Sequence, residues 1–227
     1  MALPRAVRDE LGPTPMPTAS SVIFIVDDDI SVRESLELLL QNEGWQPKTF
    51  ASAQEFLDCP RAVVPSCLVL DVSLPGLDGL ELQKRLAVER TDMPIIFITG
   101  YGDVSKTVQA MKRGAVEFLT KPFNDEVLLT AIRQALERSR LALANESEMQ
   151  ELRNRYASLT PRERQVMTLV VSGLLNKQVG GELGISEITV KAHRGQVMQK
   201  MKATSVADLV KIAGRLRLTE RSAAQTT

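Results

Sequence analysis

Cys67-Leu-Val-Leu-Asp71-Val-Ser-Leu-Pro-Gly76 is a short apolar run that ends in an aspartate and is followed by a Pro-Gly turn. A run of this length between turn signals is typical of a buried strand in a parallel sheet. The sequence therefore predicts a strand at Cys67–Leu70. Four further runs, each bounded by Asp, Gly or Pro, predict strands at Val22–Val26, Pro47–Phe50, Ile95–Thr99 and Val116–Leu119.

Amphipathic stretches separate these runs. Leu36, Leu39 and Leu40, for example, have the i, i+3, i+4 spacing of one helical face. Alternation of strand and helix indicates βαβ units, so residues 21–137 are predicted to form an α/β domain with a five-stranded, doubly wound parallel sheet. The predicted helices are Ser31–Asn42, Ala53–Leu57, Gly79–Glu89, Asp103–Lys112 and Asp125–Arg138.

The strand signals stop after this region. Residues 138–158 lack Gly and Pro and carry few apolar side chains, which predicts a helical linker. Thr160-Pro161-Arg162-Glu163 combines an N-cap Thr, a Pro at the first helical position and a Glu three residues after the cap, so a helix should begin at Pro161. Residues 159–218 are therefore predicted to be an all-α domain of four helices, the last from about Ser205 to Leu216.

Composition is consistent with two globular domains in 227 residues, since 44% of the residues are hydrophobic and 25% are charged. Residues 1–20 are rich in proline without the apolar core of a signal peptide, and both they and residues 219–227 are expected to be disordered. The longest apolar runs fall far below the roughly 18 residues of a membrane helix. We expect a cytoplasmic protein with no membrane partner.

The charge is unevenly distributed although the whole chain has a net charge of zero. Residues 21–137 contain 18 Asp plus Glu and 11 Lys plus Arg, a net charge of −7. Residues 160–218 contain 10 Lys plus Arg and 4 Asp plus Glu, a net charge of +6. This asymmetry indicates that only the second domain binds a polyanion, although ordinary scatter of surface charge would explain it equally well.

Polar side chains stand at the ends of four predicted strands. The first strand runs into Asp27-Asp28-Asp29, the third into Asp71 and the fifth into Lys121, while the fourth ends in Thr99. Ligands of an open parallel sheet bind beyond the carboxyl ends of its strands, so these groups should converge. Clustered carboxylates repel one another unless a cation holds them, and oxygen ligands suit Mg²⁺. A carboxylate neutralised in this way can attack a phosphoryl group, whose charge the lysine would balance.

The same segments resemble the receiver domain of bacterial two-component systems, over about half of the chain, which implies a flavodoxin-like fold for residues 21–137. The matching segments are Val26-Asp27-Asp28-Asp29, Leu70-Asp71-Val72-Ser73-Leu74-Pro75-Gly76, Ile98-Thr99-Gly100 and Lys121-Pro122-Phe123. The resemblance implies that Asp71 accepts phosphate from a sensor histidine kinase. It also implies that Mg²⁺ is held by Asp28, Asp71, the Ser73 carbonyl and, largely through water, Asp27.

The resemblance further implies how phosphate is sensed. Thr99 and Lys121 would bind the phosphoryl oxygens, and Phe118 would turn inward on activation. Lys121-Pro122 would be a cis peptide. The small Gly100 beside the site would leave the phosphoryl group open to water, which predicts faster loss of phosphate than a larger residue would allow. Slow self-dephosphorylation is the only enzymatic activity expected.

The segment from Asn176 to Gly195 has helix-turn-helix spacing, with a turn at Gly184-Ile185-Ser186 and a second helix that starts at Glu187 behind an N-cap Ser. Val190, Val197 and Met201 form a buried stripe on that helix, which leaves a polar face for the major groove. A solvated charged surface is the alternative. In the preceding scaffold helix, Gly180-Gly181 is unfavourable unless close packing requires it.

Leu159-Thr-Pro-Arg-Glu-Arg-Gln-Val166, Asn176-Lys177 and Ile185-Ser-Glu-Ile-Thr-Val-Lys-Ala-His193 resemble the LuxR-type domain of the NarL/FixJ family, most closely its FixJ-like branch. The resemblance implies binding of double-stranded DNA. His193, the single histidine, has no second His or Cys nearby in the sequence that would suggest a metal site. The residues expected to face DNA are Asn176, Lys177, Thr189, Lys191, Ala192, His193, Arg194 and Gly195.

The combined resemblance implies a phosphorylation-dependent transcription factor. Phosphorylated Asp71 would favour a homodimer, formed through the predicted helix Asp103–Lys112 and strand Val116–Leu119, that binds promoter DNA. RNA polymerase would be a further partner, and activation is the expected effect.

Two other protein classes share part of this pattern. A Mg²⁺-dependent aspartyl phosphatase of the haloacid-dehalogenase type would explain the acidic pocket, but Asp27-Asp28-Asp29-Ile30-Ser31 is a poor match to its DxDx(T/V) motif. A dinucleotide-binding domain would need a GxGxxG motif after the first strand, and the sequence has none there.

Overall fold

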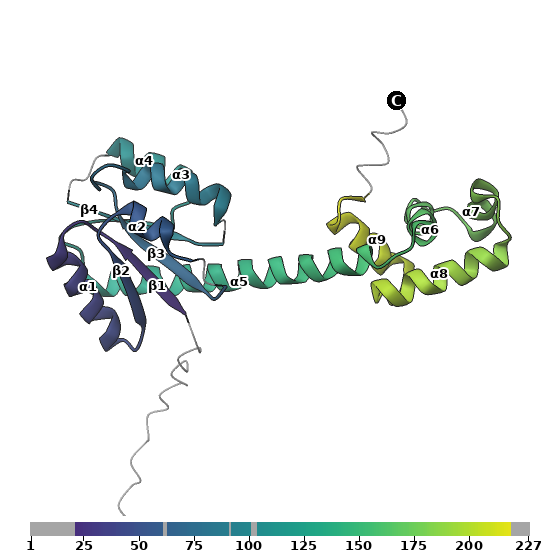
Figure 1. The fold of residues 1–227 in the computed structure, drawn as a ribbon, viewed down its shortest axis with the longest axis horizontal. Helices are drawn as coiled ribbons and strands as arrows, with labels where there is room; N and C mark the ends of the chain where they lie inside the picture. The colour runs from purple at the N-terminus through teal and green to yellow at the C-terminus, as the bar shows by residue number, and fades with distance from the viewer. Residues whose placement is uncertain (1–20, 61–62, 91, 101–103, 219–227) are drawn as a thin grey trace, which may run out of the picture. The chain divides into compact units, whose positions relative to one another are not determined.

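The computed structural model describes residues 21–60, 63–90, 92–100 and 104–218, and the chain divides into two compact units, Met1–Leu143 and Ala144–Thr227. Figure 1 shows an α/β unit and a helical unit. The segments expected to be disordered, residues 1–20 and 219–227, lie outside the described residues.

The first unit contains the predicted parallel sheet. Its strand order is β2-β1-β3-β4-β5, and every neighbouring pair is parallel. The order places β1, β3 and β4 inside the sheet, which agrees with the buried apolar runs Ile23–Val26, Cys67–Leu70 and Ile95–Ile98. All five strands lie within one residue of their predicted bounds: β1 Val22–Val26, β2 Gln46–Phe50, β3 Ser66–Asp71, β4 Ile95–Thr99 and β5 Glu117–Thr120.

Helices cover both faces of the sheet (Figure 1). The first three begin at polar N-caps, because Asp29, Ser52 and Asp78 each accept a hydrogen bond from a backbone N–H of the first turn. The predicted start of the fourth helix, Asp103, lies outside the described residues. The helices are α1 Ile30–Asn42, α2 Ala53–Asp58, α3 Gly79–Glu89, α4 Val104–Lys112 and α5 Asp125–Ala157.

Each face of the sheet buries its own core. On one face Phe24, Phe97 and Leu86 belong to a cluster that includes side chains of α2, α3 and α4. On the other face Ile25 and Ile98 pack with side chains of α1 and α5. Alternate residues of one strand therefore enter different cores, which explains why the middle residues of β1, β3 and β4 are all apolar.

The helix α5 is longer than the sequence predicted. A receiver helix ending near Arg138 and a separate helical linker were expected, whereas one helix runs continuously to Ala157. The absence of Gly and Pro from residues 138–158 leaves no breaker that would end it. Within the second unit, Leu152 of this helix is buried in the helical core.

The second unit contains α6 Pro161–Val171, α7 Asn176–Leu183, α8 Glu187–Met201 and α9 Val206–Arg215. The predicted capping box is present, since Thr160 accepts from the Glu163 N–H and Glu163 accepts from the Thr160 N–H. Glu163 also pairs with Lys200 of α8 at 2.7 Å, so the box ties α6 to α8. The buried core of this unit includes Val166, Val170, Val179, Val190, Val197, Met201, Leu209 and Ala213.

No helix among the residues that the structure describes is both long and apolar enough to cross a membrane.

Candidate functional site

Three carboxylates meet at the carboxyl end of the sheet. Asp27 follows β1 directly, Asp28 comes next, and Asp71 is the last residue of β3. One oxygen from each of these side chains lies within 4.8 Å of the others. Asp27 is fully buried and Asp71 is 6% exposed, whereas Asp28 is open to solvent. The structure therefore brings together Asp27, Asp28 and Asp71 as expected, whereas Asp29, the last residue of the acidic triplet, caps α1.

Lys121 joins this cluster from the loop after β5. Its Nζ lies 2.6 Å from Asp27 Oδ2 and 2.7 Å from Asp71 Oδ2. Burial raises the pKa of Asp27, although hydrogen bonds from Lys121 and the Asp29 backbone oppose this shift. Burial alone would lower the pKa of Lys121, but its hydrogen bonds to Asp27 and Asp71 outweigh burial and raise it. The lysine is therefore held as a cation at neutral pH.

The cluster carries excess negative charge. Three carboxylates and one ammonium give a net charge of about −2 when all are ionised. A compact group of carboxylate oxygens with this charge suits a hard divalent cation, which prefers oxygen ligands. The donor set therefore fits a divalent metal ion bound beside Asp71.

The backbone after β3 orients the Asp71 carboxylate. The Ser73 N–H donates to Asp71 Oδ1 at 2.8 Å, while Oδ2 accepts from Lys121. Both carboxylate oxygens of Asp71 are thus hydrogen bonded, and these bonds hold its side chain in one orientation. The Ser73 carbonyl, expected from the resemblance to ligate a metal, belongs to the same loop.

Thr99 and Phe118 lie on the neighbouring strands β4 and β5. Thr99 is buried at the end of β4, and its carbonyl accepts from the Lys121 N–H at 2.7 Å. Phe118 is half-buried, with its ring centroid 6.0 Å from that of Phe97. The Lys121-Pro122 peptide is cis, as the resemblance to receiver domains implied.

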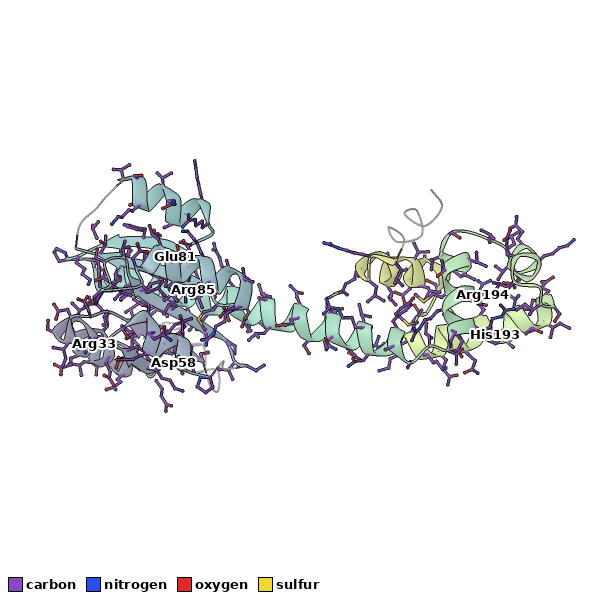
Figure 2. All side chains as sticks on the ribbon, turned by 45° about the horizontal axis from the view of Figure 1, so that its top comes forward. Arg33, Asp58, Glu81, Arg85, His193 and Arg194 are labelled. Carbon is purple, nitrogen blue, oxygen red and sulfur yellow. The ribbon has the colours of Figure 1, made fainter. Side chains whose placement is uncertain are left out.

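Two residues that support this site were missed by sequence reasoning. Arg33 of α1, labelled in Figure 2, donates from Nη1 to the carbonyls of Asp27 and Asp28, at 2.6 Å and 3.0 Å, and so holds the acidic loop. Gly79 begins α3, and a Cβ there would collide with the Asp71 carbonyl oxygen. The only sequence signal was an Arg one helical turn after the acidic triplet and a Gly at a helix start.

The second unit contains the predicted helix-turn-helix. Its helices α7 and α8 are joined by a turn at 184–186, and Ser186 caps α8 by accepting from the Thr189 N–H. Gly180 is required by packing, since a Cβ there would lie 2.7 Å from the Ile185 carbonyl oxygen. Gly181 has open space at its Cβ position, so close packing explains only one of the two glycines.

The residues expected to face DNA differ in exposure. Lys177, Lys191, Ala192 and Gly195 are exposed. The other four are partly buried. Among these, Arg194 donates to Asn176 Oδ1 at 2.9 Å and links α8 to the start of α7, and the Thr189 hydroxyl lies 2.8 Å from Ser186 Oγ. His193 and Arg194 are adjacent on α8 (Figure 2).

Each of the two units matches a known protein family. Residues 23–133 match the response regulator receiver domain, and residues 157–213 match the bacterial regulatory proteins of the luxR family. The chain is 48% identical to Nodulation protein W of Bradyrhizobium diazoefficiens, over 92% of each chain. The chain belongs to the LuxR-type response regulators.

Other similar proteins support the same family assignment for this response regulator. It is 43% identical to the transcriptional regulatory protein FixJ of Bradyrhizobium diazoefficiens, covering 87% of this chain and 97% of that one. The solved structure of the response regulator StyR is 46% identical and matches with a TM-score of 0.77 over 87% of this chain and all of StyR. Full-length FixJ from B. japonicum matches with a TM-score of 0.52.

The two matched segments contain the two sites described above. This response regulator is a phosphorylation-dependent transcriptional regulator with a DNA-binding LuxR-type domain. The family consists of transcription factors rather than enzymes, which removes the aspartyl phosphatase from consideration.

Proposed function

We propose that Asp71 is the phosphoacceptor of this response regulator and that a sensor histidine kinase is the donor. Its position between Lys121 and the Ser73 N–H is the observation that carries the proposal. In the transfer, a carboxylate oxygen of Asp71 forms a bond to phosphorus while the P–N bond of a phosphohistidine breaks. The leaving imidazole takes up a proton, and Lys121 with the Thr99 hydroxyl binds the phosphoryl oxygens.

The metal bound in this proposal is Mg²⁺, held by Asp27, Asp28, Asp71 and the Ser73 carbonyl. The support is the group of carboxylate oxygens within 4.8 Å of one another. When bound, Mg²⁺ offsets the carboxylate charge so that an anionic donor can approach. Lys121 supplies only one of the positive charges that three carboxylates and a phosphoryl group require.

The output of phosphorylation is proposed to be a homodimer that binds DNA. Thr99 and Phe118 would communicate the phosphoryl group to the face formed by α4 and β5. Exposed apolar side chains of α4, at Val104, Val108 and Met111, favour such a contact.

The protein would act in the cytoplasm and recruit RNA polymerase as an activator. The proposed domains are a receiver at 21–137, a linker at 138–158 and the DNA-binding domain at 159–218.

The DNA surface would be the exposed side of α8 with the start of α7. Basic side chains there would contact phosphates, and residues near the start of α8 would read base edges. The net charge of +6 over residues 160–218 favours DNA as the partner. The proposed contact residues are Asn176, Lys177, Thr189, Lys191, Ala192, His193, Arg194 and Gly195.

Labelling with acetyl phosphate and Mg²⁺, followed by intact-mass spectrometry, tests the phosphoacceptor. Wild type should gain one phosphoryl group, and Asp71→Asn should gain none. Asp29→Asn is a matched control, because Asp29 caps α1 outside the carboxylate cluster and Asn is an equally good cap. Retained labelling of Asp71→Asn would contradict the assignment.

Mobility shifts on promoter DNA, with and without acetyl phosphate, test the coupling. Phosphorylation should strengthen binding by wild type and leave Asp71→Asn unchanged. Binding that does not respond to phosphorylation in wild type would refute the proposed output.

A further inference from the structure

The helix α8 presents one continuous exposed stripe. Ile188, Lys191, Ala192, Gly195 and Gln199 are exposed, and they follow i, i+3, i+4, i+7 and i+11 spacing, which places them on one side of the helix. We call these five residues the exposed α8 face. The buried stripe of Val190, Val197 and Met201 points into the core of the unit. The exposed α8 face is thus separate from the surface that holds the domain together.

The N-terminal half of this face is largely apolar. Ile188 is 80% exposed in the first turn of α8, and Ala192 lies one turn later. Lys191 lies beside them, paired with Glu187 at 3.5 Å across an exposed surface where such pairs contribute little. A single exposed isoleucine is ordinary on a protein surface. This one is informative because it lies in the turn that reads bases in a helix-turn-helix.

Gly195 is a second, independent observation on the same face. It lies inside α8, where a glycine is less favourable than an alanine. A Cβ at Gly195 would meet nothing within 4 Å, so packing within the protein does not explain it, in contrast to Gly180. A missing side chain on an open helix face permits the close approach of another molecule.

We propose that the exposed α8 face reads thymine methyl groups in the DNA major groove, with Ile188 and Ala192 in contact with the methyl groups and Gly195 allowing the helix to seat closely. The C5-methyl of thymine is the apolar group that a base edge presents in that groove. Ile188 and Ala192 have no side-chain hydrogen-bonding group, so neither can recognise the polar edges of the other bases. The inference rests on the proposed DNA-binding function. It predicts that the exposed α8 face selects operators with thymine at the positions that Ile188 and Ala192 contact.

The test begins with selection of duplex DNA from a random library by the full chain treated with acetyl phosphate and Mg²⁺. Each thymine of the selected half-site is then replaced by deoxyuridine, which removes only the methyl group. At one or two positions per half-site the affinity of wild type should fall about four-fold, from the loss of one buried methyl group. Ile188→Ala should bind the thymine and deoxyuridine duplexes equally well at the position that Ile188 contacts.

Val210→Ala is the matched control, because it also removes exposed apolar atoms from the same unit, on α9, outside the proposed DNA surface. Its thymine-to-deoxyuridine ratio should equal that of wild type. Failure to select any DNA would refute the proposed function and the inference with it. Selected DNA that tolerates deoxyuridine everywhere, or an equal deoxyuridine effect in Ile188→Ala and wild type, would overturn the inference alone.

Discussion

Replacing Gly180, Gly181 and Gly195 by alanine, one at a time, should give opposite changes in the stability of the helical unit. All three lie inside helices, so each alanine gains helix propensity of about 0.5–1 kcal/mol. Gly181 and Gly195 have open space at the Cβ position, so they should keep this gain. Gly180 faces the Ile185 carbonyl oxygen at 2.7 Å from the added Cβ, so its alanine must displace backbone.

The magnitudes follow from these surroundings. A forced backbone shift in a packed core costs about 1–3 kcal/mol, which exceeds the propensity gain. Gly180→Ala should therefore destabilise the unit, by up to about 2.5 kcal/mol. For a unit of this size 1 kcal/mol shifts the Tm by about 4–8 °C, so Gly181→Ala and Gly195→Ala should each raise it by about 2–8 °C.

Thermal unfolding of the full chain separates the two units. Trp45 is the single tryptophan and is partly buried against one of the receiver cores, so its fluorescence reports only receiver unfolding. Circular dichroism reports helix loss in both units. The transition that Trp45 does not follow is assigned to the helical unit, and the Trp45 transition should be the same in all three variants.

DNA binding distinguishes the two glycines that lie in open space. Gly195→Ala should weaken operator binding although it stabilises the fold, whereas Gly181→Ala should leave binding unchanged. Equal operator affinity of Gly195→Ala and wild type would refute the close approach of DNA at Gly195. Stabilisation by Gly180→Ala would refute the packing argument.

Three further outcomes are expected. Gly79→Ala should lower both the Tm of the receiver and its labelling by acetyl phosphate, because the added Cβ would collide with the Asp71 backbone; an unchanged Trp45 transition would contradict this. Chelation with EDTA should abolish labelling and excess Mg²⁺ should restore it, by intact mass. Hydrogen bonding to Lys200 lowers the pKa of Glu163 in the folded protein, so ionised Glu163 stabilises the fold. This stabilisation is fully present above the pKa that Glu163 has in the unfolded chain, and it is lost as the pH falls through its lower pKa in the folded protein. Acid unfolding should therefore show a smaller loss of stability between about pH 6 and pH 3 in Glu163→Gln than in wild type.

Local rules explain why the sequence predicted so much of the fold. The apolar run before Asp71, the helical spacing of Leu36 and Leu40, and the capping box at Thr160 each depend on residues a few positions apart. The end of α5 was missed because no breaker follows Arg138, and without one the sequence holds no signal for where a helix stops.

The sequence by itself determined that carboxylates stand at the ends of β1 and β3, because strand ends are set locally and parallel strands share one edge. Only the tertiary structure decided that one lysine bonds both Asp27 and Asp71, which lie 94 and 50 residues away from it in the chain. It also decided which glycine is needed for packing. Gly180 and Gly181 are adjacent and chemically identical, and only the approach of a distant backbone carbonyl distinguishes them.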